Sequence, residues 1–399
     1  MKITKVDVFQ VNNSMNPLWR PVLCRIHTDE GIYGDGEAAM AFGVGTTAAF
    51  GMVQDLAKLI IGMDPLENEV IWDKLYKHTF WGLNGGCVVT AGISALDIAL
   101  WDIKGKYYNA PVYKLLGGKL NDNLRTYASQ LQMGWGEQIQ TLRSDEEYAE
   151  AALKAVSEGY DAVKFDFFIN KPLEGKYNDR ERTTLLTQPI LEEVVGRIAA
   201  VRKAVGPYVD IIIENHSYLD AQSSIQLARA AEPYNIFYFE EPNTPDTQTA
   251  KYISSKVNIP IANGERIYTR WQYAKFFQDN TIQVAQPDLG TCGGITEVKK
   301  VCDMAYTYDV AVQIHACGSP ICTAAALQLE AVIPNFIIHE HHQANLCEHN
   351  IMLCKYNYQP VNGKYKVPEL PGIGNELSDY VLNHAQKVTI DNNLYTWDI

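Results

Sequence analysis

Between residues 125 and 346, the sequence repeatedly alternates short β-rich runs with amphipathic helical patterns. Such alternation predicts a parallel sheet, because each helix returns the chain to the edge where the next strand begins. We expect eight strands, at 125–130, 162–166, 209–214, 236–240, 259–264, 282–286, 310–315 and 336–340. Helices such as 145–158, 189–205, 220–231, 295–308 and 321–332 lie between them. Eight units favour a closed (β/α)8 barrel over an open sheet.

The segments on either side of this repeat have a different pattern. The N-terminal part combines expected strands at 2–11, 22–28 and 32–37 with helical patterns at 46–61, 67–79 and 86–107. The C-terminal part is irregular, and its one expected helix covers 376–386. We therefore expect an α+β domain over 1–124, the barrel over 125–346, and a C-terminal segment over 347–399 that packs back on the first domain.

The composition narrows the classes of partner and the compartment. The net charge of −13 argues against nucleic acid or an anionic membrane surface as the main partner. No run approaches the roughly 20 apolar residues of a membrane helix, and the first residues lack the apolar block of a signal peptide. The eight cysteines include no Cys-x-x-Cys pair, which favours buried free thiols over a disulfide set and predicts a cytoplasmic protein.

Polar residues lie at the C-terminal ends of consecutive expected strands. From the third strand onward they recur every 23 to 27 residues, which is the length of one strand–helix unit: Glu214, Glu240, Glu265, Asp288, His315 and Glu340. We expect them to lie side by side on one rim of the barrel, the face where barrel enzymes place their active sites. Any single carboxylate at such a position could instead be the N-cap of the following helix.

Three glutamates on adjacent strands require a positive charge between them. The carboxylates of Glu214, Glu240 and Glu265 would repel one another at close range. Three hard oxygen ligands suit Mg²⁺, with further positions left for water or substrate oxygens. These positions hold neither cysteine nor paired histidine, which argues against zinc. The prediction is a magnesium site.

Two histidines on the rim could transfer protons. His315 follows an apolar strand, and Asp288 ends the preceding one, so the pair suits a general base; the alternative is a hydrogen-bonded core histidine. The two-residue spacing places Lys164 with Asp166, and Glu214 with His216, on one face of their strands. His216 would then be a second acid/base group beside the metal.

The remaining candidates on the last strand are less specific. Glu340 could stay protonated, or it could hydrogen bond to a developing enolate. The nearby His339, His341, His342 and His349 look like a metal cluster by composition, but they alternate between faces or lie in a loop, and Mg²⁺ does not favour them.

Several longer motifs resemble those of the enolase superfamily. They are SALDIALWDIKGK at 94–106, FEEP at 239–242, NGERIYTR at 263–270, QPDLGTCGGITE at 286–297 and HACGSP at 315–320. The resemblance spans nearly the whole chain. It is closest to the acid-sugar dehydratases of the mandelate racemase subgroup, of the D-galactonate dehydratase type and more loosely the D-mannonate dehydratase type.

The resemblance implies a modified TIM (β/α)8 barrel with an α+β N-terminal capping domain. It implies Mg²⁺ ligands at Glu214, Glu240 and Glu265, and a proton-abstracting dyad of His315 with Asp288. It implies His216 as the acid that assists the departing hydroxyl, and Glu340 as a hydrogen-bond partner of the enediolate.

Two positions depart from the pattern of the subgroup. The first metal ligand is usually Asp, and the longer Glu214 stands there in this chain. Many racemases of the superfamily carry Lys-x-Lys on the second strand, and here the pair is Lys164-x-Asp166. Because the second lysine is the base on the opposite face of the substrate, its loss argues against racemisation and favours elimination.

The expected function is β-elimination of water from a sugar acid, with Mg²⁺, to give a 2-keto-3-deoxy acid through an enediolate. Lys164 and Asp166 are expected to contact the substrate, and the long segment 167–187 could be a lid over it. Two alternatives are an epimerase or cycloisomerase on the same scaffold and a non-catalytic protein that binds sugar acids. The chain is expected to form a homo-oligomer, either a dimer or an octamer.

Overall fold

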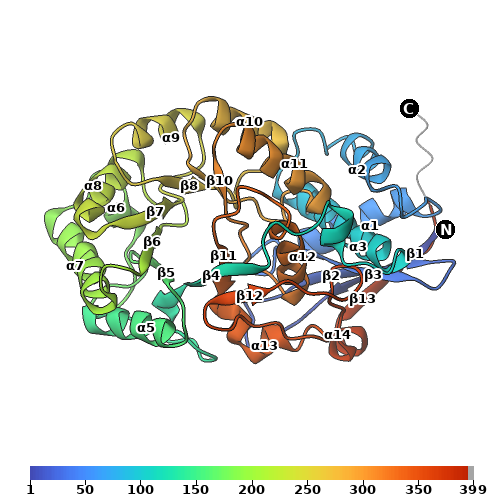
Figure 1. The fold of residues 1–399 in the computed structure, drawn as a ribbon, viewed down its shortest axis with the longest axis horizontal. Helices are drawn as coiled ribbons and strands as arrows, with labels where there is room; N and C mark the ends of the chain where they lie inside the picture. Colours follow the sequence, from blue (N-terminus) through green and yellow to red (C-terminus); the bar gives the residue numbers. More distant parts are fainter. Residues whose placement is uncertain (394–399) are drawn as a thin grey trace.

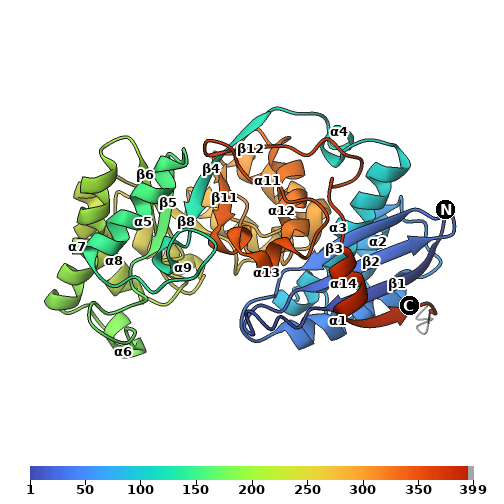
Figure 2. The same ribbon diagram turned by 90° about the horizontal axis from the view of Figure 1, so that it is seen from below.

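The computed structural model describes residues 1–393, which form an antiparallel sheet beside a ring of parallel strands and helices (Figures 1 and 2). The antiparallel sheet has the order β13-β1-β2-β3. Its strands are β1 (Ile3–Gln10), β2 (Val22–Thr28), β3 (Tyr33–Ala38) and β13 (Gln386–Ile390). The first three agree with the predicted strands, and the turn at 29–31 joins β2 to β3.

Three helices cover this sheet, and one of them approaches it unusually closely. The helices are α1 (Thr46–Ile60), α2 (Asn68–Lys77) and α3 (Cys87–Tyr107). Along β3, a Cβ atom at Gly34 or Gly36 would overlap the carbonyl oxygens of Ala99 and Ala95 in α3. Glycine at these two positions therefore lets the backbone of α3 rest directly on the strand. The short helix α4 (Val112–Leu115) then leads out of this domain.

Eight strands form the parallel ring in the order β11-β4-β5-β6-β7-β8-β9-β10. Parallel backbone hydrogen bonds close it: Val312 of β10 accepts from Ile337 at 3.0 Å and donates to Asn335 at 2.8 Å. The predicted barrel with an α+β capping domain is therefore confirmed. The strands are β4 (Asn123–Ser129), β5 (Ala162–Asp166), β6 (Asp210–Glu214), β7 (Ile236–Glu240), β8 (Ile261–Asn263), β9 (Val284–Ala285), β10 (Ala311–Val312) and β11 (His339–His342).

The later strands are shorter than predicted. Strand β8 begins only at Ile261, because Pro260 has no amide hydrogen to donate to a ladder. Beyond β9 and β10, a single bridge between Asp288 and His315 continues the pairing. The last strand begins at His339 rather than at the predicted residue 336. Phe336 lies outside the strand and forms only the single bridge to Val312 that closes the ring.

Helices surround the ring of strands (Figure 1). Ser144 and Glu147 form a capping box at the start of α5. Their side chains satisfy backbone amides of the first turn that have no partner within the helix. The helices of the ring are α5 (Asp145–Ser157), α6 (Asp179–Arg182), α7 (Gln188–Val205), α8 (Ala221–Ala231), α9 (Thr247–Ser254), α10 (Thr269–Gln278), α11 (Gly294–Thr307) and α12 (Pro320–Glu330).

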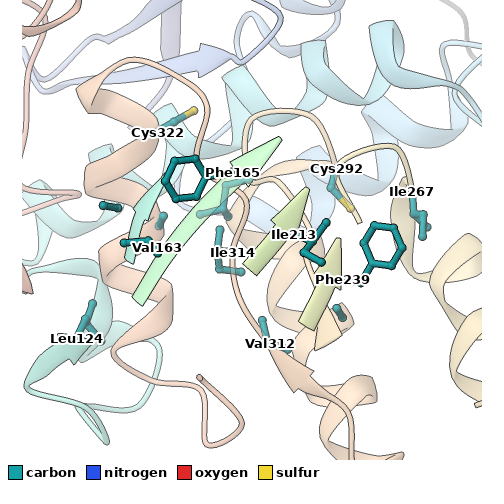
Figure 3. Packing of buried hydrophobic residues seen from close by; sticks show 14 of the residues in the cluster. Leu124, Val163, Phe165, Ile213, Phe239, Ile267, Cys292, Val312, Ile314 and Cys322 are labelled. Carbon is teal, nitrogen blue, oxygen red and sulfur yellow. The ribbon is translucent and has the colours of Figure 1, made fainter. Parts of the chain in front are cut away.

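Side chains alternate between the two faces of the barrel strands, and both faces are buried. Val163, Ile213 and Phe239 belong to the large cluster between strands and helices (Figure 3). Their neighbours Ile212 and Tyr238 fill the barrel interior. Because side chains on a strand repeat with a period of two, Lys164, Glu214 and Glu240 point toward the barrel interior from the ends of their strands.

The C-terminal segment returns to the capping domain. It contains α13 (Glu348–Ile351), β12 (Lys364–Lys366) and α14 (Asp379–His384) before β13. The predicted helix at 376–386 is too long, because Ala385 is extended and the chain continues as β13. That strand pairs with β1, with Val8 opposite Val388, and completes the antiparallel sheet (Figure 2).

All eight cysteines are free, and most of them are buried, as predicted. Within residues 1–393, no helix is both long and apolar enough to cross a membrane.

Substitution Gly36→Ala should destabilise the protein, because the new methyl group would push α3 away from β3. We expect the free energy of unfolding to fall by about 1–3 kcal/mol in chemical denaturation. The control is Gly51→Ala in α1, where a Cβ atom meets no other atom within 4 Å. That change should be neutral or stabilise by up to about 1 kcal/mol. Equal losses for the two variants would contradict the close approach of α3.

Candidate active site

A buried lysine lies among three glutamates at the ends of the barrel strands. The Lys164 Nζ atom is 2.7 Å from Glu240 Oε1, 2.9 Å from Glu340 Oε1 and 3.2 Å from Glu214 Oε2. The four side chains are at most 1% exposed. Burial alone would lower the pKa of Lys164, but the carboxylates of Glu240, Glu340 and Glu214 raise it well above its usual value. The amine is therefore an ammonium that neutralises part of the cluster.

Glu340 is ionised in this arrangement. Burial opposes ionisation, but the charges of Lys164 and His315 hold its pKa well below the usual range. Its Oε1 accepts from Ser129 Oγ at 2.6 Å, and its Oε2 accepts from the amide of Ala316 at 3.0 Å. Of the two alternatives for Glu340, the low pKa and these two donors favour the ionised side chain.

The three predicted metal ligands do not converge on one point in the structure. In residues 1–393, no three His, Cys, Asp or Glu side chains are arranged as a ready metal site. Glu265 instead contacts His315 Nε2 at 2.8 Å and forms an ion pair with Arg266. Glu214 and Glu240 lie opposite each other in register. Glu240 Oε2 is buried without a hydrogen-bond partner, and Glu214 Oε2 is buried with only the Lys164 ammonium nearby, at 3.2 Å.

These two under-coordinated oxygens fit a hard cation. A buried carboxylate oxygen without a donor is costly, and a divalent ion would satisfy it. In the described part of the chain, the site also holds more carboxyl groups than cations. Lys164, Arg266 and the rings of His216 and His315 face seven carboxyl groups, which are Asp166, Glu214, Glu240, Glu241, Glu265, Asp288 and Glu340. Burial and the charge of Glu214 raise the pKa of Glu240 well above its usual value, as expected for a carboxyl group that lacks a cation. The donor set is therefore compatible with Mg²⁺.

His315 and Asp288 form the first of two histidine–aspartate pairs. The His315 Nδ1 atom is 2.6 Å from Asp288 Oδ2, and the amide of Gly290 donates to Asp288 Oδ1 at 2.6 Å. Burial would lower the pKa of His315, but Glu265 and Asp288 raise it well above its ordinary value. The aspartate thus fixes the ring and leaves Nε2 facing Glu265.

His216 and Asp166 form the second pair, which the sequence analysis did not anticipate. The His216 Nδ1 atom is 2.8 Å from Asp166 Oδ2. The other ring nitrogen, Nε2, lies 3.3 Å from the Gln130 amide, which in turn accepts from Gln132. Burial opposes protonation, but Glu214 and Asp166 raise the pKa of His216 to about 10.

The two pairs lie on opposite sides of the barrel. Asp166 ends β5 and His216 follows β6, whereas Asp288 and His315 follow β9 and β10. In the closed ring of eight strands, β6 and β10 are four strands apart, and so are β5 and β9. A substrate bound on the barrel axis would therefore meet one imidazole from each side.

Several residues at the strand ends adopt left-handed backbone conformations without being glycine. They include Gln130, His216, Ser217, Glu241 and Thr269, with φ between 44° and 65°. Such conformations are costly for residues with side chains and concentrate at functional sites. This signal lies in the backbone, so the sequence could not reveal it.

Glu241 and Arg266 are further members of the site that the sequence analysis did not single out. Arg266 forms ion pairs with both Glu241 and Glu265. Burial and the charge of Glu265 raise the pKa of Glu241 to about 8. The FEEP and NGERIYTR motifs contain both residues, and their position beside predicted ligands was the available signal.

The four histidines that the sequence analysis excluded as metal ligands do not gather in one site. Each of them has a different neighbour, as expected from side chains that alternate between faces or lie in a loop. His339 contacts Glu330 at 2.7 Å, and His341 contacts the Tyr160 hydroxyl at 2.6 Å. The ring of His342 accepts from the amide of Ala344 at 3.0 Å, and His349 packs edge-on against Trp19. Each of these rings has a local structural partner.

The capping domain reaches the loop that carries His315. Glu37, at the end of β3, accepts hydrogen bonds from the amide and hydroxyl of Ser319, at 2.9 Å and 2.6 Å. Ser319 is the N-cap of α12 and lies four residues after His315. The antiparallel sheet therefore helps to hold one wall of the site.

Substitution Lys164→Met should leave three buried carboxylates without their cation. In chelator-treated protein, we expect the free energy of unfolding to fall by about 3–5 kcal/mol in chemical denaturation. The control is Lys171→Met, which breaks a partly exposed pair with Glu181 and should cost at most about 1 kcal/mol. If the loss at Lys164 were no larger than that of the control, the charge compensation by Lys164 would be refuted.

Comparison with known proteins identifies the family. Residues 11–117 match the mandelate racemase / muconate lactonizing enzyme N-terminal domain, and residues 147–381 match the enolase C-terminal domain-like family. The chain is 31% identical to D-galactonate dehydratase of Variovorax paradoxus, over 97% of this chain and 95% of that protein. It is also 31% identical to D-xylonate dehydratase of Haloferax volcanii, over 94% and 86% of the two chains.

A solved structure agrees with these matches. A member of the enolase superfamily from Salmonella Typhimurium is 53% identical, with a TM-score of 0.95 over 98% of this chain and 99% of that one. The resemblance found in the motifs is therefore confirmed. The chain belongs to the mandelate racemase/muconate lactonizing enzyme family of the enolase superfamily.

Proposed function

We propose that this protein is a Mg²⁺-dependent hydro-lyase that removes water from a sugar acid and yields a 2-keto-3-deoxy acid. The observation that carries the proposal is the pair of histidine–aspartate dyads on opposite sides of a carboxylate-rich rim. The names of the relatives, D-galactonate dehydratase and D-xylonate dehydratase, support the same reaction class.

We propose that Glu214, Glu240 and Glu265 hold the cation, with Glu265 turning away from His315 and Arg266. When bound, Mg²⁺ would polarise the substrate carboxylate and so acidify the hydrogen on carbon 2. The longer side chain of Glu214, in place of the more common aspartate, is compatible with this role because its Oε2 is buried, accepts no hydrogen bond and has only the Lys164 ammonium nearby.

His315 would remove the proton from carbon 2 once Glu265 has turned toward the cation, because the loss of that contact lowers the pKa of the ring and frees Nε2. Its Nε2 atom faces the rim, and Asp288 holds Nδ1 and stabilises the imidazolium that forms. The electron pair of the broken C–H bond moves into the carboxylate group, which becomes an enediolate. Lys164 and Glu340 lie beside this position, with Glu340 4.0 Å from His315 Nε2, and they would contact the enediolate oxygens.

His216 would complete the elimination from the other side. Its protonated ring would donate to the hydroxyl on carbon 3, which leaves as water while the electron pair of the enediolate forms the C2–C3 double bond. Asp166 would keep the ring oriented throughout. The resulting enol then converts to the 2-keto-3-deoxy acid.

An epimerase or cycloisomerase uses the same first step. The absence of a second lysine argues less strongly against epimerisation than the sequence suggested, because His216 lies on that side of the barrel.

Assembly as a dimer or octamer and a cytoplasmic location also stay predictions.

The proposal is tested by turnover of a panel of aldonic and aldaric acids. With Mg²⁺, we expect formation of 2-keto acid, and its loss when the metal is chelated. His315→Asn should lower kcat by about 10²–10⁴-fold, because it removes the general base. His384→Asn, on the exposed helix α14, is the control and should be unchanged. Undiminished turnover by His315→Asn would refute the assignment. Deuterium incorporation at carbon 2 without keto product would indicate an epimerase.

The opposed histidines also predict the stereochemistry of the substrate. A base on one face and an acid on the other require the hydrogen on carbon 2 and the hydroxyl on carbon 3 to be anti. In an extended carbon chain, only the threo configuration at these carbons meets that requirement. D-Galactonate and D-xylonate both have it. D-Talonate, the carbon-2 epimer of D-galactonate, should react at least about tenfold more slowly in kcat/KM. Equal rates for the two epimers would exclude anti elimination from an extended chain.

A further inference from the structure

The guanidinium of Arg197 is fully buried over the ring of Tyr148, 5.0 Å from its centroid, and has no ion-pair partner within 4 Å in the described part of the chain. Arg197 lies in α7 and is 0% exposed. Its hydrogen bonds go only to backbone carbonyls, those of Phe167 and Asn170 at 2.6 Å and that of Arg143 at 3.2 Å. Its Nε atom has no hydrogen-bond partner. Burying a charged group in this way is costly, and the cost calls for a reason beyond packing.

The first of these carbonyls belongs to a peptide group that also binds Asp166. The carbonyl of Phe167 accepts from Arg197, and the amide of Phe168, the other end of the same peptide group, donates to Asp166 Oδ1 at 2.8 Å. Asp166 in turn contacts His216 Nδ1 through its second oxygen. A single rigid peptide group therefore links the guanidinium to the histidine–aspartate dyad.

The second carbonyl holds the chain just beyond that peptide. Asn170 is itself buried, and its side chain donates to the carbonyl of Leu142 at 3.1 Å. With contacts at both Phe167 and Asn170, Arg197 clamps the connection that leaves β5. A cation at the carbonyl oxygen also polarises the peptide, which strengthens the amide as a donor to Asp166.

We propose that Arg197 is a positioning residue for His216, and that it acts through the peptide group between Phe167 and Phe168 and through Asp166. The kinetic consequence rests on the proposed dehydratase function. The structural consequence, the orientation of the His216 ring, does not.

The same helix offers a matched control. Arg202 also lies in α7 and also bonds to backbone carbonyls, those of Gly206, Val209 and Tyr234 among them. Val209 and Tyr234 precede β6 and β7, at the end of the barrel opposite the rim of carboxylates. Loss of Arg202 removes the same kind of clamp without touching the path to His216.

The experiment compares Arg197→Met with Arg202→Met in two measurements. The first is the hydrogen-bonded Nδ1 proton of His216, observed by NMR in protein labelled with ¹⁵N-histidine and assigned by its absence from His216→Gln. We expect Arg197→Met to shift this signal and speed its exchange with water, and Arg202→Met to leave it unchanged.

The second measurement is turnover of D-galactonate, in which Arg197→Met should lower kcat at least about tenfold and change KM by no more than about twofold.

Arg197→Lys keeps the positive charge but cannot bridge both carbonyls, so it should show a smaller change of the same kind and serves if Arg197→Met does not fold. An unchanged His216 signal in the Arg197 variants, or the same shift in Arg202→Met, would overturn the proposal. If the wild type turned over no sugar acid, the proposed function would fail, and the NMR comparison would still decide the role of Arg197.

Discussion

The site depends on the charge of Lys164. Its ammonium group lies within 3.2 Å of carboxylates from β6, β7 and β11, so one cation connects three walls of the barrel. Without it, the inward-facing glutamates would repel one another in a medium that screens poorly. Arg266 and the two histidines, whose pKa values rise for that reason, compensate only part of the remaining carboxyl groups. The carboxyl oxygens still outnumber the cations, and this surplus of hard donors makes the rim suitable for a divalent cation.

Closure of the barrel places the two histidine–aspartate pairs opposite each other. Strands four places apart in a ring of eight face each other, so the dyads on β5/β6 and β9/β10 meet across the axis. Neither dyad is held by its strand alone. The loop of His315 is fixed by Glu340 from within the barrel and by Glu37 from the capping domain, whereas Asp166 is fixed from α7. Elements around the barrel therefore share in orienting two imidazole rings.

Much of the fold could be predicted from local pattern. The alternation of strand and helix in the barrel and the first three strands depend on residues close in sequence, and the structure contains all of them. Strand β13 was missed because most of its residues are exposed and it acquires its extended form by pairing with β1, nearly 380 residues away. The late start of β8 likewise reflects Pro260, which cannot donate to the ladder, rather than strand propensity.

For the site, the sequence by itself determined which residues end the strands, because a 23- to 27-residue spacing must bring them to one rim. Only the tertiary structure decided their partners. Asp166 is predicted to contact the substrate, and the structure adds that it holds His216. Lys164 is the central cation of the glutamates, and Glu340 is ionised beside it. The reason is physical: spacing along the chain sets the level of a side chain in the barrel, whereas hydrogen bonding and charge state depend on groups from strands distant in sequence.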